Sequence, residues 1–323
     1  MTEGSSPPTC SPNTNEGEGL VHDAEYWLED GNIILISRDI VFRIYRGLLA
    51  AQSPVFAVMF SSRSAEVCEG TPIFRLSDSP EDFRHFLHVV LPQKGRQFYG
   101  EEPHLTFDQV SAVIRLAHKY HVEDIERQAL SALKAYYTDD FDQYDQRDDE
   151  DIESLPVAFA DTVPHAIAAI NLARLTDTPS VLPLAFYRCS NLGSNVLDGY
   201  RRDDNSVEYL STADLKRCME GRNALGREAL KVILRIFRDE SCDECRTPQH
   251  CRAELRLMLV DAANYECATD CNVLGSWNIF IHGAVKDRKL CDDCKEALEA
   301  RDYEERRGLW FKLPDIFDLN VKG

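Results

Sequence analysis

The stretch from Asp30 to Phe60 constrains the fold more than any other part of this chain. Apolar and polar residues alternate over Ile33–Ser37 and again over Ile40–Tyr45, which predicts two short strands. The two residues between these strands, Arg38 and Asp39, fit a tight turn. We therefore expect the strands to form a hairpin.

Two short helices are predicted directly after the hairpin. The first covers Arg46–Ala51. Ser53 is placed to cap the second helix, with Pro54 in its first position, where the missing N–H costs no hydrogen bond. The apolar residues behind this start are Val55, Phe56, Val58, Met59 and Phe60.

Residues 61–137 extend the same pattern. Thr71–Leu76 is typical of a strand, and Ser79 begins a helix. A loop rich in Gly, Pro and charge follows over 92–102. Thr106 is a candidate N-cap for an amphipathic helix, and Glu123–Tyr137 predicts another.

This order of elements, and the run LLAAQSPVF at 48–56 in particular, closely resembles the BTB domain, also called the POZ domain. The resemblance covers residues 20–137 and is strongest to the large set of BTB proteins from filamentous and mushroom-forming fungi, including the basidiomycetes. It implies short strands with a helical cluster, and a module for protein–protein interaction rather than catalysis. Two departures are visible. Tyr45 stands where the family usually has a histidine, and the long loop Pro92–Pro103 replaces a compact Tyr-Thr-Gly segment.

The resemblance also implies a homodimer. BTB domains commonly dimerise through their first helix and the segment before their first strand. We expect this chain to expose an apolar set there for a second copy, larger than a monomer normally leaves in water. The set comprises Tyr26, Trp27, Leu28, Leu48 and Leu49. The alternative is that Trp27 and its neighbours fold back on their own domain.

A second implied partner is a cullin. BTB adaptors that bind cullins tend to carry a hydrophobic-x-Glu triplet between the second short helix and the third strand. Val67-Cys68-Glu69 fits this position, which makes Val67 and Glu69 candidate partner-binding residues. Two functions stay open: a self-associating scaffold or regulatory subunit, and a substrate adaptor for a cullin-type ubiquitin ligase.

Composition predicts four parts in this chain of 323 residues: a disordered tail at 1–19, the BTB domain at 20–137, an acidic linker at 138–155 and a helical domain at 156–323. Nine acidic residues and one arginine lie between Asp139 and Glu153. Such charge density favours a solvated, flexible linker. A docking tail for a basic partner is the alternative.

The C-terminal part is predicted to be all-α, so the chain as a whole is α+β. It shows no internal repeat and no convincing strand. Helices are expected from Thr178 and from Ser211, and over His165–Leu175, Ala224–Phe237, Arg252–Glu266 and Asp292–Phe311.

Two Cys-x-x-Cys pairs in this part suggest one structural zinc ion. Cys242 with Cys245, and Cys291 with Cys294, would supply a closed four-sulfur shell. The 45 residues between the pairs (positions 246 to 290) exceed the ~15–20 of common zinc motifs, so reduced, partly buried thiols are the alternative. Further candidates stay open: Cys251, His250 or His282 could replace one ligand, and Cys267 and Cys271 are expected to be core thiols.

A metal that joins these pairs would hold the last helix in place. The apolar residues near the end of that helix, Trp310 and Phe311, are then expected to be buried with Leu309, Leu313, Ile316 and Phe317.

Several classes of protein are disfavoured. A net charge of −19 argues against nucleic acid, and the short basic clusters Arg201-Arg202 and Arg306-Arg307 are expected to be solvated helix ends. We expect no membrane segment, no signal peptide, and a location in the cytoplasm or nucleus, where most of the 11 cysteines would be reduced or bound to metal.

We also expect no enzymatic activity. The closest catalytic pattern is His121-Val122-Glu123 with Cys242-x-x-Cys245, which echoes the zinc deaminases. Ser241 stands where that signature has a proline.

Overall fold

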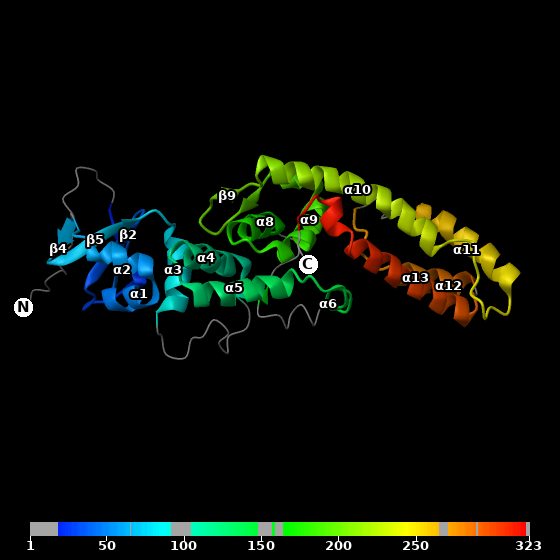
Figure 1. Ribbon diagram of the computed structural model, residues 1–323, viewed down its shortest axis with the longest axis horizontal. Helices are drawn as coiled ribbons and strands as arrows, with labels where there is room; N and C mark the ends of the chain where they lie inside the picture. Colours follow the sequence, from blue (N-terminus) through cyan, green and yellow to red (C-terminus); the bar gives the residue numbers. More distant parts are fainter. Residues whose placement is uncertain are drawn as a thin grey trace, which may run out of the picture. The chain divides into compact units, whose positions relative to one another are not determined.

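The computed structural model describes residues 19–64, 66–91, 105–147, 157–158, 164–264, 271–288 and 290–320. Figure 1 shows the chain coloured along its sequence. It divides into two compact units. Of the described residues, the first unit contains 19–133, 157–158 and 201–206, and the second contains 134–147, 164–200 and 207–320.

The first unit is built on a five-stranded sheet in the order β1-β3-β2-β5-β4. Its strands are β1 (Val21–Trp27), β2 (Ile33–Ser37), β3 (Ile40–Ile44), β4 (Glu66–Cys68) and β5 (Thr71–Leu76). The predicted hairpin is confirmed, because β2 and β3 are antiparallel and Ser37 pairs with Ile40 across a turn in which Arg38 has a φ of 50°.

Two of these strands were not predicted. β1 pairs parallel with β3, and β4 pairs antiparallel with β5. The β1 sequence, VHDAEYW, has no regular alternation, and its register with β3 shifts between His22 and Trp27. Its strand conformation is decided by the neighbouring strand rather than by its own pattern.

Among the described residues, the helices that accompany the sheet are α1 (Arg46–Gln52), α2 (Pro54–Ser61), α3 (Pro80–Val90), α4 (Phe107–Lys119) and α5 (Glu123–Tyr136). The short strand β6 (Leu105–Thr106), directly before α4, pairs parallel with β7 (Val157–Ala158), which follows α6 in the sequence. The predicted caps are present. The Ser53 hydroxyl accepts a bond from the Phe56 N–H and donates to the Tyr120 carbonyl, and Thr106 forms a capping box with Gln109.

The strand β2 is predicted correctly, but the expected alternation is wrong for it: its sequence IILIS is almost continuously apolar because the strand is buried on both faces. One face, with Ile33 and Leu35, belongs to the main core together with residues of β3 and the helices, including Phe42, Phe56, Phe83, Phe86 and Tyr120. The other face carries Ile34 and Ile36 in a smaller apolar cluster.

The second unit is helical, as predicted. Its helices are α6 (Phe141–Asp145), α8 (Ala166–Leu175), α9 (Leu182–Asn191), α10 (Thr212–Ile236), α11 (Pro248–Ala263), α12 (Asn278–Arg288), α13 (Asp292–Trp310) and α14 (Leu313–Ile316). Single 3-10 turns cover Pro179–Val181 and Gly193–Leu197, and β8 (Tyr200–Arg201) pairs with β9 (Val207–Glu208). Figure 1 shows α10, α11, α12 and α13 side by side, and α13 contacts both α10 and α12.

Several local expectations for this unit need correction. α10 is one helix of 25 residues where two were predicted. α12 and the β8–β9 pair were not predicted. The stretch expected to be a flexible acidic linker contains α6, which Asp140 caps and whose Phe141 is buried.

Candidate metal centre and interaction surfaces

The four predicted zinc ligands lie together in the second unit. The Sγ atoms of Cys242, Cys245, Cys291 and Cys294 are all within 4.8 Å of one another. Cys242 Sγ lies 3.4 Å from Cys294 Sγ, and Cys245 Sγ lies 3.7 Å from Cys291 Sγ. Four sulfurs at the ~2.3 Å Zn–S distance on a tetrahedron would be about 3.8 Å apart. The arrangement therefore fits one tetrahedral metal ion.

Local structure brings each pair of thiols to one side of the backbone. Cys242 and Cys245 lie in the connection between α10 and α11, where the Cys245 N–H donates to the Cys242 carbonyl (3.2 Å). Cys291 is the N-cap residue of α13, and Cys294 lies in its first turn. Arg301 holds the two segments together, because its guanidinium on α13 donates to the carbonyls of Ile236 and Glu240 before the first pair.

The thiols are set in apolar surroundings. Cys294 belongs to the buried core of α10, α11 and α13, with Cys242, Cys245 and Cys291 partly buried against it. Burial raises the pKa of Cys291 and of Cys294, which disfavours thiolates without a nearby cation. A bound divalent ion would supply that charge and hold the thiolates.

The alternative ligands are placed differently. Cys251 is fully buried, with its Sγ 3.8 Å from Cys291 Sγ, so a fifth thiol borders the cluster. His250 is exposed, and the ring of His282 is bound to Glu299 (2.8 Å), so neither histidine is in the cluster. Cys271 is buried, as expected of a core thiol. Cys267 lies outside the described residues.

The end of α13 is buried largely as predicted. Leu309, Trp310, Leu313 and Phe317 are all below one tenth exposed. The prediction is wrong for Phe311, whose side chain is 63% exposed. Ile316 is only partly buried.

The residues predicted at a dimer interface divide into two groups. Tyr26 and Leu49 are buried in the core of the first unit, so they are not exposed as the prediction required. Trp27 and Leu28 are half-buried, and Leu48 is exposed. The expectation that Trp27 folds back holds in part, since its ring stacks on His22 at 3.5 Å between centroids. The homodimer itself stays a prediction.

The candidate cullin triplet lies on a β-hairpin rather than in a plain loop. Val67 is in β4 and is 61% exposed. Glu69 is exposed in the turn before β5, where its φ of 48° and that of Gly70, 83°, fit a two-residue type I′ turn. Cys68 between them is disulfide-bonded, an exception to the reduced state expected of most cysteines.

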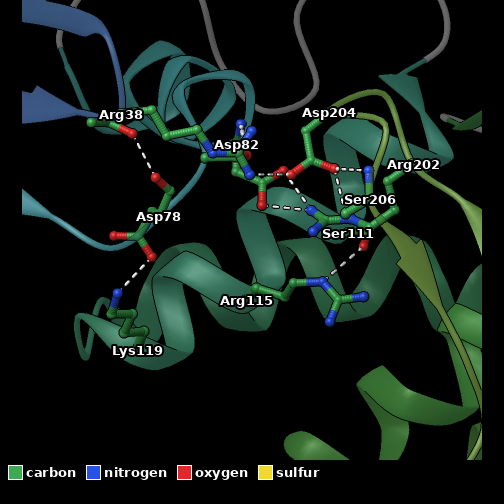
Figure 2. Close-up of polar contacts among 11 residues, drawn as sticks. Arg38, Asp78, Asp82, Ser111, Arg115, Lys119, Arg202, Asp204 and Ser206 are labelled. Carbon is green, nitrogen blue, oxygen red and sulfur yellow. Dashed lines mark hydrogen bonds and ion pairs between the residues drawn. The ribbon is translucent and has the colours of Figure 1, made fainter.

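A charged cluster in the first unit was missed by sequence reasoning (Figure 2). Arg202, expected to be solvated, donates to both carboxylate oxygens of Asp82 at the start of α3 (2.6 and 2.5 Å). Asp204 accepts from Arg38 (3.0 Å) and from the Ser206 N–H (3.0 Å). These bonds hold the loop 201–206 in the first unit. No periodic signal marks them, since the partners are distant in sequence.

A second arginine expected to be solvated is also buried. Arg306, in α13, is 3% exposed and forms an ion pair with Asp302 at 2.9 Å. The interpretation of Arg306-Arg307 as a solvated helix end is therefore wrong for Arg306.

The triplet His121-Val122-Glu123, which is similar to part of the zinc deaminase signature, lies where a helix begins. His121 has a φ of 52° in the turn between α4 and α5, and Glu123 is the first residue of α5, as predicted.

Comparison with known proteins identifies the N-terminal part. The BTB/POZ domain family matches residues 29–136, so the chain carries a BTB/POZ domain. BTB/POZ domains are protein–protein interaction modules. No curated protein matches the chain. In the described part of the chain, no helix has the length and apolar character needed to cross a membrane.

Proposed function

We propose that this protein is a non-enzymatic interaction protein that self-associates through its BTB domain and serves as a scaffold or regulatory subunit. The observation that carries the proposal is a partly exposed apolar surface at the end of β1 and on α1. It consists of Leu28 and Leu48, whereas Trp27 packs against the smaller cluster with Ile34 and Ile36 on the other face of the sheet. The fully buried Tyr26 and Leu49 support this surface from inside the core.

Hydrogen bonds bring the two parts of this surface close together. The turn after β1 closes with the Gly31 N–H donating to the Leu28 carbonyl (3.0 Å). The Arg46 N–H, at the start of α1, donates to the Asn32 side chain in that turn (2.7 Å). The Tyr45 hydroxyl, where the family usually has a histidine, donates to Asp30 (2.5 Å). The surface is therefore held by the fold before any partner arrives.

Light scattering on the full chain tests the proposal. At tens of micromolar we expect the mass of a dimer, and Leu48→Glu is expected to give a monomer, because a buried charge in an apolar interface has no partner. Val58→Glu is the control, since Val58 is 71% exposed on α2 and lies outside the proposed surface. A monomeric wild type, or a Leu48→Glu dimer, would contradict the proposal.

A role as substrate adaptor for a cullin-type ubiquitin ligase is the second candidate. The observation that favours it is the exposed pair Val67 and Glu69 on the β4–β5 hairpin. A rigid two-residue turn presents Glu69 at little cost in conformational entropy. Its carboxylate could make a charge-assisted contact with a partner.

Capture of a cullin by the immobilised full chain tests this second role. Glu69→Lys should abolish capture while leaving the melting temperature unchanged, because exposed charges contribute little to stability. Glu29→Lys makes the same charge change at another exposed site of the unit. Equal capture by wild type and Glu69→Lys would remove Glu69 from the role, and no capture by wild type favours the plain scaffold.

The proposal includes one structural zinc ion, held by Cys242, Cys245, Cys291 and Cys294, and protein partners as yet unidentified. Eight of the described cysteines are free thiols, which supports a reducing compartment, the cytoplasm or the nucleus. The net charge of −19 argues against nucleic acid and against anionic membrane surfaces as partners.

A further inference from the structure

The fifth thiol, that of Cys251, lies directly against the four-thiol cluster of the second unit. Cys251 is near the start of α11 and is fully buried. Its Sγ lies 3.8 Å from Cys291 Sγ, in a contact that has the Cys251 thiol as donor and the Cys291 sulfur as acceptor. Thr247 Oγ1 contacts the Cys251 sulfur as well, at 3.4 Å. The Cys251 thiol is therefore held in an orientation directed at one ligand of the proposed zinc ion.

Cys251 is not needed to complete the zinc shell. The four sulfurs that all lie within 4.8 Å of one another are those of the two Cys-x-x-Cys pairs, and four sulfurs fill a tetrahedral site. A thiol outside this shell is not bonded to the metal. It can therefore attack a neighbouring sulfur without first leaving the metal, whereas any of the four ligands would have to dissociate.

Cys291 is open to a small oxidant. Cys294, in the same pair, is only 3% exposed, whereas Cys291 is only partly buried at the N-cap of α13. As a ligand of zinc, Cys291 is a thiolate, which is the form of cysteine that hydrogen peroxide oxidises. Cys245 is also partly buried and also contacts Cys251, so a link between these two residues is the competing product.

We propose, on the basis of the zinc centre proposed above, that hydrogen peroxide joins Cys291 and Cys251 in a disulfide and so removes one ligand from the metal. The Cys291 thiolate first attacks peroxide, so that an S–O bond forms, the O–O bond breaks and hydroxide leaves. The Cys251 thiol then attacks the resulting sulfenic acid, so that the S–S bond forms, the S–O bond breaks and water leaves. The two cysteines together supply the two electrons that peroxide accepts.

The disulfide changes how strongly the metal is held. Three thiolates remain on the zinc ion, so the zinc is released more readily to a competing chelator. A dithiol reductant breaks the disulfide and restores the fourth ligand. The zinc centre would therefore respond reversibly to peroxide, through a residue that is not itself a ligand.

Peptide mapping of the full chain after peroxide treatment tests the disulfide. Trypsin separates the thiols of the cluster into three peptides, which are residues 239–246 with Cys242 and Cys245, residues 247–252 with Cys251, and residues 290–295 with Cys291 and Cys294. Free thiols are alkylated and no reductant is used. We expect peptide 247–252 to be linked to peptide 290–295, with fragmentation placing the bond at Cys291. A bond from Cys251 to Cys245, or no bond to Cys251, would overturn the proposal.

The rate of zinc release into a colorimetric chelator during peroxide treatment tests the role of Cys251. Cys251→Ser should release zinc at least about threefold more slowly than the wild type, because the sulfenic acid at Cys291 lacks its neighbouring thiol. Cys218→Ser is the matched control, since it removes another buried thiol, on α10, and should behave like the wild type. Equal rates for Cys251→Ser and the wild type would contradict the proposed role. Should Cys251→Ser fail to fold, the peptide map of the wild type still decides the disulfide.

The zinc content before oxidation separates this inference from the zinc centre itself. A purified chain that lacks zinc and still forms the bond between Cys251 and Cys291 would support the thiol pair and contradict the zinc centre. A chain that contains one zinc ion and forms no bond to Cys251 would retain the zinc centre and overturn the disulfide.

Discussion

Arg202 donates to both carboxylate oxygens of Asp82, at 2.6 and 2.5 Å, although 120 positions separate the two residues. Their side chains are only 13% and 14% exposed. A charge in such surroundings is costly once its partner is removed, because water does not replace the lost contact. The pair therefore holds the loop 201–206 in the first unit.

Asp82→Asn should release this loop. It keeps the shape of the side chain but removes the charge that Arg202 needs, and we expect a loss of about 1–3 kcal/mol in unfolding free energy. Amide exchange over residues 201–206 should accelerate, as measured by mass spectrometry on the full chain. Asp203→Asn, an exposed position in the same loop, is the control. Unchanged exchange in Asp82→Asn would show that the pair does not hold the loop.

Gly221 in α10 allows Phe317 to pack against the helix backbone. A Cβ at position 221 would lie 2.2 Å from two carbons of the Phe317 ring. That ring is 1% exposed and stacks on Phe186 at 5.4 Å, so it has no room to retreat. Gly221→Ala should therefore lower the unfolding free energy by about 1–3 kcal/mol, as measured by denaturant titration.

Gly226 in the same helix provides a matched control for this prediction. Apart from its chain neighbours and the surrounding helix backbone, no atom of the described residues lies within 4 Å of a Cβ built there. Gly226→Ala should stabilise by about 0.5–1 kcal/mol, because alanine loses less backbone entropy in a helix. If both substitutions shift stability in the same direction, close packing at Gly221 is not the cause.

Removal of metal should destabilise the second unit. Purified full chain is expected to contain about one zinc ion, and a strong chelator should lower its melting temperature by at least ~5 °C. Cys291→Ser should have the same effect, because it removes one of the four thiolates. Elemental analysis measures the zinc content, and a thermal scan measures the melting temperature. Protein without metal, with a melting curve indifferent to chelator, would identify the four residues as ordinary core thiols.

A variant of Cys251, the fifth thiol that borders the cluster, tests which four cysteines bind the metal. Cys251→Ser is expected to retain one zinc per chain, because the four sulfurs of the two Cys-x-x-Cys pairs already complete a tetrahedron. Loss of zinc from Cys251→Ser, with retention in Cys242→Ser or Cys245→Ser, would place Cys251 in the shell instead.

Local chemistry made parts of the fold predictable. The turn at Arg38-Asp39 and the caps at Ser53 and Thr106 depend on residues within a few positions of one another, and all are present. The paired spacing of cysteines likewise predicted which four thiols gather, since Cys-x-x-Cys already places two sulfurs on one side of a turn.

What the sequence by itself determined, then, was the kind of element at each strongly patterned segment and the chemistry each pair of cysteines could offer. Only the tertiary structure decided that Tyr26 and Leu49 are core residues, that Arg202 binds Asp82, and that Cys251 lies beside Cys291. These relationships join residues that are distant along the chain. They depend on which surfaces pack together, and packing is settled by the burial of many side chains at once rather than by any local pattern.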